Sequence, residues 1–200
     1  RDFCLSRGLG DVYKRQILWR DLMRVITGIA RGRKLVTLEG EEVVRPTTDR
    51  VKEAMFSIIQ FDIPGKSVLD LFAGSGQLGI EALSRGAEKA VFVDKSAEAF
   101  SVVKQNLKTC GLSDKATVIN SDSFSFLRST AEKFDIILID PPYSRQMAET
   151  ALSLVDGVLK DGGIVMCETD YREDLPEEVG DIKKIKEYKY SKTKLTTYKK

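Results

Sequence analysis

The sequence predicts an α/β fold, with a mostly parallel sheet of seven strands, helices on both faces, and a small β-hairpin before it. Short apolar runs rich in β-branched residues alternate with longer segments of helical spacing between residues 67 and 167. The connections are long enough to cross over between parallel strands. Four of the runs are closed by an aspartate, namely Asp70, Asp94, Asp122 and Asp140.

The segment before the sheet divides into two parts. Residues 1–22 show no helical or strand period, and we expect a non-native or disordered leader; a native basic arm is the alternative. Residues 23–44 are predicted to form the β-hairpin, because apolar residues flank a glycine-rich centre. The domain proper is expected over residues 45–200.

The first predicted helix follows the segment Arg45–Arg50. Thr47 or Thr48 is a suitable N-cap, and Asp49 favours the first turn of a helix. The apolar residues that follow, Val51, Met55, Ile58 and Ile59, recur at helical spacing.

The rest of the domain alternates strands and helices. Strands are predicted over residues 67–71, 90–94, 116–119, 134–139 and 163–167, and helices over 77–85, 96–110, 122–127 and 147–159. Residues 182–190 and 195–198 are expected to close the sheet as an antiparallel pair. The carboxyl ends of parallel strands share one edge, so the four aspartates are expected to converge on one crevice.

Composition narrows the chemistry. The 200 residues are 42% hydrophobic and 31% charged, as expected for one soluble domain. No secretory signal or membrane-length apolar run is seen, so we expect a cytoplasmic protein. There is no histidine and the three cysteines form no CxxC pair, which excludes the usual zinc sites and histidine-based catalysis, and we expect no metal.

The net charge is +2, and basic residues gather at both ends of the chain. Four basic residues of the predicted hairpin come before its first acidic residue, namely Arg24, Arg31, Arg33 and Lys34. At the other end of the chain, eight lysines lie between residues 183 and 200. This distribution favours a surface for a polyanion, although solvated lysines on exposed strands explain the carboxyl-terminal cluster equally well.

The most informative stretch is Asp140-Pro141-Pro142-Tyr143. It follows an apolar run typical of a buried strand, and the two prolines fix the backbone just past the carboxylate. A carboxylate, a rigid carbonyl and a flat ring suit the binding of a planar, amine-bearing heterocycle. A proline loop with a capping aspartate is the simpler interpretation of these four residues alone.

The loop after the first strand indicates a nucleotide-like cofactor. Residues 74–79 match GxGxxG, and Asp94 lies 18 residues past the second glycine, as in nicotinamide-dependent enzymes. However, Asp70 would repel a pyrophosphate and attract an ammonium. A cofactor with ribose, adenine and a sulfonium-methionine tail fits better, with Asp94 at the ribose and Asp122 at the adenine amine.

Four segments together are similar to one known family. They resemble segments of the RsmD-type bacterial 16S rRNA (guanine-N2) methyltransferases. The four segments are Arg45-Pro-Thr-Thr-Asp-Arg50, Asp70-Leu-Phe-Ala-Gly-Ser-Gly76, Glu81-Ala-Leu-Ser-Arg-Gly86 and Asp140-Pro-Pro-Tyr143. The resemblance covers Met23 to about Tyr198 and implies a Rossmann-like class I methyltransferase fold. Gln77 and Ser191 depart from the family's pattern, since a small residue and a glycine are usual there.

The resemblance implies methyl transfer from S-adenosyl-L-methionine to a guanine N2 amine, with S-adenosyl-L-homocysteine as product. It implies that Asp140, Pro141, Pro142 and Tyr143 hold the guanine. The cofactor is expected at Asp70, Phe72, Ala73, Gly74, Gly76, Asp94, Lys95, Asp122 and Ser123. We expect RNA phosphates at Arg31, Arg33, Arg45, Thr47 and Arg50.

The expected partner is small-subunit ribosomal RNA, within an assembling small ribosomal subunit, and we expect a monomer that does not bind membranes. Two alternatives stay open from the sequence. The first is an adenine N6 methyltransferase of DNA or RNA, which would hold its amine with the same Asp-Pro-Pro-Tyr arrangement. The second is a non-catalytic RNA-binding assembly factor that shares the fold.

Overall fold

The structure, a computed structural model, describes residues 23–38, 46–142 and 146–200. The predicted leader and the predicted site residues Arg45 and Tyr143 lie outside these ranges, as does the side chain of Thr47. No helix among the described residues is long and apolar enough to cross a membrane.

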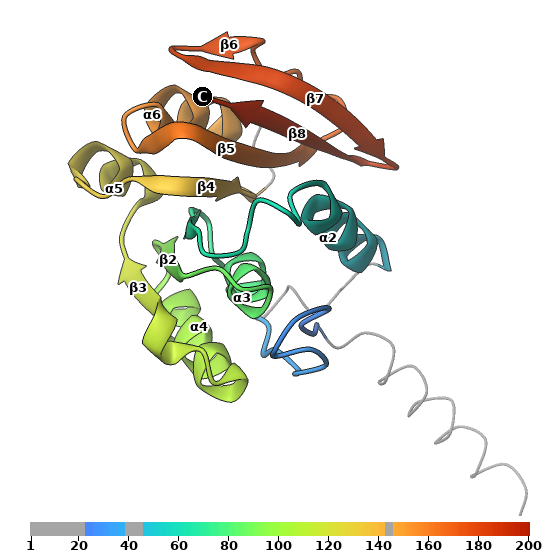
Figure 1. Ribbon diagram of the computed structural model, residues 1–200, viewed down its shortest axis with the longest axis vertical. Coiled ribbons are helices and arrows are strands. Elements are labelled where there is room, and N and C mark those ends of the chain that lie inside the picture. The colour runs from blue at the N-terminus through green and yellow to red at the C-terminus, as the bar shows by residue number, and fades with distance from the viewer. Residues whose placement is uncertain (1–22, 39–45, 143–145) are drawn as a thin grey trace, which may run out of the picture.

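One sheet of eight strands, in the order β3-β2-β1-β4-β5-β8-β7-β6, forms the centre of the fold (Figure 1). The strands are β1 Ser67–Asp70, β2 Lys89–Asp94, β3 Ala116–Asn120, β4 Phe134–Ile139, β5 Leu159–Asp170, β6 Glu178–Val179, β7 Ile182–Tyr190 and β8 Thr193–Lys199. Strands β1 to β5 pair in parallel, and β6 to β8 pair antiparallel. The predicted number of seven was one too low, because the two-residue strand β6 is too short to show a pattern.

Helices cover both faces of the sheet. They are α2 Pro46–Ile58, α3 Gln77–Ser84, α4 Ala97–Cys110, α5 Ser123–Ser129 and α6 Met147–Val155, with a 3-10 turn η1 at Ser113–Lys115. Helices α2, α3 and α4 pack into one apolar core, and α5 and α6 into the other (Figure 1). The strand β1, in the middle of the parallel part, is buried along its whole length, including its polar end residues Ser67 and Asp70.

The third glycine of the GxGxxG segment lets α3 lie close to the sheet. A Cβ atom added to Gly79 would lie 2.3 Å from Cε1 of Phe92 in β2. A side chain at this position would therefore push the helix away from the strand. This packing fixes the start of α3 at the carboxyl end of β1.

The predicted ends of α4 are confirmed. The hydroxyl of Ser96 accepts a hydrogen bond from the backbone N–H of Ala99 at 3.2 Å. Gly111 ends the helix in the left-handed conformation, with a φ of 68°. The cap and the glycine together define the β2–α4–β3 crossover.

The predicted N-terminal β-hairpin is only partly formed in the described residues. A single antiparallel bridge joins Arg24 to Lys34. Backbone hydrogen bonds also join the two arms, from the N–H of Val25 to the carbonyl of Arg33 at 3.0 Å and from the N–H of Leu35 to the carbonyl of Met23 at 2.8 Å. The segment also binds α3, since the N–H groups of Ile26 and Thr27 donate to the carboxylate of the buried Glu81 at 2.7 and 3.0 Å.

The carboxyl-terminal part differs from the prediction at one boundary. Helix α6 ends at Val155 rather than at residue 159, because Leu159 already begins the long strand β5. The predicted closing pair is confirmed as β7 and β8, joined by a turn at Ser191. Ser191 has a φ of 55°, the left-handed conformation in which a glycine carries no steric cost.

Candidate functional site

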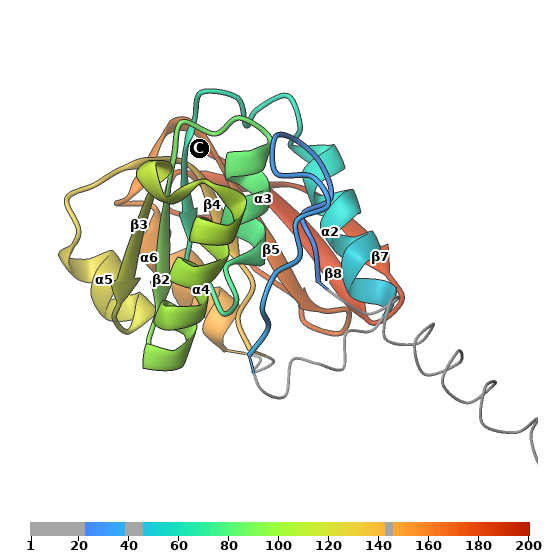
Figure 2. The same ribbon diagram turned by 90° about the horizontal axis from the view of Figure 1, so that it is seen from below.

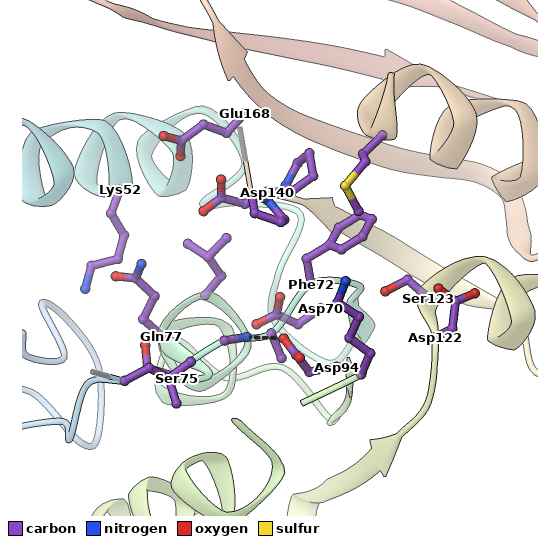
Figure 3. Close-up of a pocket in the computed structure, with 18 residues that line it drawn as sticks. Lys52, Asp70, Phe72, Ser75, Gln77, Asp94, Asp122, Ser123, Asp140 and Glu168 are labelled. Carbon is purple, nitrogen blue, oxygen red and sulfur yellow. Dashed lines mark hydrogen bonds between the residues drawn. The ribbon is translucent and has the colours of Figure 1, made fainter. Parts of the chain in front are cut away.

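A cavity of about 460 Å³ opens at the carboxyl edge of the parallel strands (Figure 3). The loops after β1, β2, β3 and β4, the end of β5, helices α2 and α6, and the N-terminal segment all contribute to it. Its walls contain Leu38, Lys52, Asp70, Phe72, Ala73, Gly74, Ser75, Gln77, Leu78, Asp94, Lys95, Asp122, Ser123, Asp140, Pro141, Pro142, Met147 and Glu168. The predicted crevice therefore exists and contains all four aspartates.

The glycine loop after β1 forms one wall. Gly74 and Gly76 have φ values of 51° and 80°, which glycine adopts without strain. The N–H of Gly76 donates to the carbonyl of Ala73 at 2.6 Å and closes the turn. Gly76 itself is not on the cavity wall, and a Cβ there would lie 3.1 Å from Val103. Its role is to shape the loop that brings Gly74 to the cavity.

Asp70 is the last residue of β1, and its carboxylate is buried beneath the glycine loop. It is only 1% exposed and accepts a hydrogen bond from the N–H of Gly79 at 2.8 Å. Burial raises the pKa of Asp70 to about 7, the hydrogen bond from Gly79 opposes this, and the charges of Asp140 and Asp94 add to it. A nearby cation would therefore be strongly attracted to this carboxylate.

Asp94 fixes the glycine loop against the end of β2. One carboxylate oxygen accepts from the N–H of Gly74 at 2.9 Å (Figure 3). The other accepts from the N–H of Ser96 at 2.8 Å. An ionised carboxylate has about four acceptor sites, so roughly two remain for hydroxyl groups of a ligand. The neighbouring Lys95 also lines the cavity.

The loop after β3 provides Asp122 and Ser123. The exposed carboxylate of Asp122 caps α5, because it accepts from the N–H of Ser125 at 2.9 Å. This hydrogen bond is the main reason why the pKa of Asp122 lies below its ordinary value. The hydroxyl of the buried Ser123 donates to the carbonyl of Leu71 at 2.6 Å and ties this loop to the one after β1. Both residues were predicted to bind the cofactor, and both reach the cavity.

An aromatic surface lies between these two loops. The ring of Phe72 lines the cavity and meets the ring of Phe124 edge-on, with 6.1 Å between their centroids. Contact with Phe124 holds the Phe72 ring in place. A flat heterocycle would find an apolar face here, next to the Asp122 carboxylate.

Asp140 follows β4 directly and lies across the cavity from the glycine loop. Pro141 is buried and Pro142 is exposed, and both line the cavity with Asp140. The prolines have no N–H, so this stretch presents oxygen atoms but few donors. Tyr143 lies outside the described residues, and its predicted role stays a prediction.

Two charged residues of the cavity were not predicted. Glu168 is near the end of β5, one position past the predicted strand 163–167. Residues at the carboxyl ends of parallel strands were expected to face the crevice, so a longer predicted strand would have included Glu168 among them. Lys52 lies on the buried face of α2 and is 3% exposed; its ammonium donates to the carbonyl of Arg24 at 2.9 Å. Burial lowers the pKa of Lys52. The sequence did not predict that Lys52 is buried, because lysines are mostly exposed in folded proteins.

Comparison with known proteins identifies the family. The family described as Conserved hypothetical protein 95 matches residues 23–199. Ribosomal RNA small subunit methyltransferase D of Haemophilus influenzae is 41% identical over 153 residues, which are 74% of this chain and 79% of that protein. The chain belongs to the RsmD-type methyltransferase family. YlbH of Bacillus subtilis is 43% identical over 89% of this chain and 99% of that protein.

Solved structures agree with the family and with the fold. The structure of yhhF from Escherichia coli is 34% identical, covers 88% of this chain and 97% of that chain, and has a TM-score of 0.80. An RNA methyltransferase from Salinibacter ruber, solved with S-adenosyl-L-homocysteine, is 15% identical over 78% of this chain and 93% of that chain, with a TM-score of 0.62. The second likeness concerns the fold alone, and it confirms the predicted Rossmann-like class.

The basic residues predicted to bind RNA are not all near the cavity of this RsmD-type chain. The segment with Arg31 and Arg33 runs along α3 to the opposite edge of the sheet (Figure 2), where the N–H of Ile29 donates to the carbonyl of Ser84. Arg31 and Arg33 are exposed there, away from the cavity wall. Arg50 is exposed on α2, two residues before Lys52. A phosphate-binding role for these arginines stays a prediction.

No group of three or more His, Cys, Asp or Glu residues in the described ranges could hold a metal ion. The two described cysteines are free, and burial raises the pKa of Cys167 far above its usual range, so its thiol stays protonated. The cavity wall offers carboxylates, hydroxyl groups and the ammonium groups of Lys52 and Lys95.

Proposed function

We propose that this protein transfers a methyl group from S-adenosyl-L-methionine to the exocyclic N2 amine of a guanine in small-subunit ribosomal RNA. One observation carries the proposal. The acceptor-rich stretch Asp140–Pro141 and the glycine loop with Asp70 and Asp94 face the same cavity from neighbouring strands. A methyl acceptor bound at the first would lie next to a methyl donor bound at the second.

The chain's own residues fit the proposed cofactor. Asp94 has free acceptor sites for two ribose hydroxyls, and Phe72 offers an apolar face to the adenine ring beside Asp122. Asp70 would attract the positive end of the molecule through its carboxylate, whose pKa is raised by burial. Lys95 and Ser123 complete the wall. When bound, S-adenosyl-L-methionine supplies an electrophilic methyl group on a sulfonium.

The residues of the Asp140 stretch would prepare the amine for attack. The lone pair of an exocyclic amine is delocalised into the ring, so the amine is a weak nucleophile. The Asp140 carboxylate and the Pro141 carbonyl would each accept one N–H and favour a tetrahedral nitrogen. Catalysis would then rest on orientation and on fixed acceptors that stabilise the positive charge developing on nitrogen. Asp140 is suited to take the proton that the amine loses.

The target base must leave its stack to reach this cavity. Tyr143 would stack on it, which is worth roughly 1 to 3 kcal/mol for a base on an aromatic ring. Arg45, Thr47 and Arg50 would bind phosphates of the RNA, whereas Arg31 and Arg33 would reach RNA only at the opposite edge of the sheet.

The name of a relative supports the proposed substrate class. The Haemophilus influenzae relative carries the name ribosomal RNA small subunit methyltransferase D. In this proposal the shape of a partly assembled small subunit would supply the selection of the target. We propose that the protein acts there as a monomer, in the cytoplasm.

Transfer of labelled methyl from S-adenosyl-L-methionine tests the proposal. The acceptors are small ribosomal subunits that lack their methylations, naked small-subunit RNA, and DNA. Asp140→Ala is compared with Asp161→Ala, an exposed carboxylate on the same strand pair. We expect label in the subunits, a loss of about a hundredfold or more for Asp140→Ala, and no change for Asp161→Ala.

Two other results would redirect the proposal. Label on an adenine amine would indicate an adenine N6 methyltransferase instead. Binding of RNA and cofactor without any transfer, and without an effect of Asp140→Ala, would indicate an assembly factor that uses the same fold.

A further inference from the structure

Lys52 places a buried cation on the wall of the cavity. It belongs to α2 and is only 3% exposed, yet it lines the cavity together with Ser75 and Gln77. Figure 3 shows these three side chains at one end of the cavity and Asp122 at the other end, with Asp70 between them. A ligand that fills the cavity along its length would therefore bring one of its ends next to Lys52.

The charge of Lys52 is not neutralised by a carboxylate of its own. In the part of the chain that the structure describes, its ammonium donates to the carbonyl of Arg24 at 2.9 Å and makes no ion pair. The nearby Glu81 is already paired with Arg85 at 2.8 Å, and it accepts two backbone N–H groups as well. An ammonium has three N–H donors, so two are left for a ligand.

Burial and neighbouring charges act on Lys52 in opposite directions. Burial lowers its pKa from the ordinary 10.5, whereas the charges of Glu81 and Asp49 raise it. The ordinary value lies about 3.5 units above pH 7, and burial must lower the pKa by more than this before the ammonium loses its proton at neutral pH. A carboxylate bound beside the ammonium would favour the charged form. The position therefore suits the anionic group of a ligand.

S-adenosyl-L-methionine carries one anionic group, the α-carboxylate at the end of its methionine part. With the ribose at Asp94 and the adenine beside Asp122, the methionine part would extend past Asp70 to the end of the cavity with Lys52 (Figure 3). Gln77, on the wall at the same end, can also donate from its side-chain amide. One carboxylate and one ammonium of the protein thus match the opposite charges of the amino-acid end of the cofactor.

We infer that Lys52 binds the α-carboxylate of S-adenosyl-L-methionine and so positions the methionine end of the cofactor. Lys52 is then a cofactor-binding residue on α2, a helix for which the sequence predicted only contacts with RNA. The inference rests on the proposed function, because it uses the placement of the ribose at Asp94 and of the positive end at Asp70. It adds the group that fixes the far end of the methyl donor.

The test compares two ligands that differ only in this carboxylate. One is S-adenosyl-L-homocysteine, and the other is its decarboxylated analogue, which keeps the amine at the end of a three-carbon chain. Their dissociation constants are measured by calorimetry near pH 7 for the wild type, Lys52→Met, Lys52→Gln, and Lys108→Met, an exposed lysine on α4 outside the cavity wall. The Gln variant removes the charge and keeps a donor for the carbonyl of Arg24.

We expect the wild type and Lys108→Met to favour S-adenosyl-L-homocysteine over the decarboxylated analogue by roughly ten- to a hundredfold, as for a hydrogen bond between charged groups. Both Lys52 variants should lower this ratio by about tenfold or more, because only the ligand with the carboxylate loses a partner. Their affinity for the decarboxylated analogue should not fall by more than about threefold, which shows that the variants are folded.

A structural role of Lys52 gives a different result. Both ligands would then be weakened equally in the Lys52 variants, or the ratio would stay at its wild-type value, and either outcome would overturn the inference. A wild-type ratio near one would overturn it too. The measurement needs no RNA, so it is separate from the methyl-transfer test. Absence of label in guanosine, with the ratio as expected, would overturn the proposed substrate and leave the role of Lys52 in place.

Discussion

Asp70→Asn should make the protein more stable at high pH. The substitution keeps the shape and an acceptor for the N–H of Gly79, and it removes a charge from a side chain that is 1% exposed. The pKa of Asp70 rises from 3.8 to about 7 on folding, because burial disfavours the ionised form. The native state therefore binds this proton more tightly than the unfolded state. The stability that the protonated carboxyl gives is complete below pH 4 and is lost as the pH rises to 7.

The magnitude follows from the size of this shift. Three pKa units correspond to about 4 kcal/mol when Asp70 is fully ionised, and about 2 kcal/mol of this develops between roughly pH 5.5 and pH 8.5. Urea unfolding of both proteins at these two pH values measures it. The advantage of the Asn variant should grow by about 2 kcal/mol at the higher pH. An advantage that stays constant, or that shrinks, would refute the burial argument for Asp70.

The same variant tests the cofactor role of this carboxylate. The Asn side chain cannot attract a cation, so the affinity for S-adenosyl-L-methionine should fall by about tenfold or more, as expected for the loss of a charged partner. In the wild type the affinity should rise with pH up to about 7, where Asp70 becomes ionised. Equal affinities of the two proteins at roughly pH 8.5 would contradict the proposed place of the cationic end.

Three further substitutions test the fold. Ser191→Gly should raise the free energy of unfolding by about 1 kcal/mol, because it relieves a φ of 55° in the β7–β8 turn; no gain in urea unfolding would contradict this. Gly79→Ala should lower it by roughly 1 to 3 kcal/mol, because a Cβ would lie 2.3 Å from Phe92, and an unchanged melting temperature would show that α3 moves freely. Glu81→Ala should release the segment 23–38 to proteolysis before the rest of the domain unfolds, whereas simultaneous cleavage would mean that other contacts hold it.

The sequence predicted the convergence of the aspartates because the rule behind it is geometric. Parallel strands end at one edge, so Asp70, Asp94 and Asp140 had to meet once the strands were recognised. The bounds of the strands were harder to predict. The fifth strand seemed to stop before Glu168, because a polar residue next to the cavity breaks the apolar pattern that defines a strand.

Long-range contacts explain the other differences. The N-terminal hairpin was predicted from local alternation, but its backbone donors bind Glu81 and Ser84 of α3, more than 50 residues away. The same contacts carry Arg31 to the edge of the sheet opposite the cavity. Lys52 is buried because the carbonyl of Arg24 accepts from it, and no local pattern shows such a partner.

The most direct test of the account is the identity of the methylated nucleoside. Small subunits labelled by the wild type are digested to nucleosides and separated beside the Asp140→Ala reaction. We expect label in N2-methylguanosine that falls by about a hundredfold or more with Asp140→Ala. Label in any other nucleoside, or an equal yield from the Asp140→Ala protein, would contradict the claim that Asp140 holds a guanine amine at this cavity.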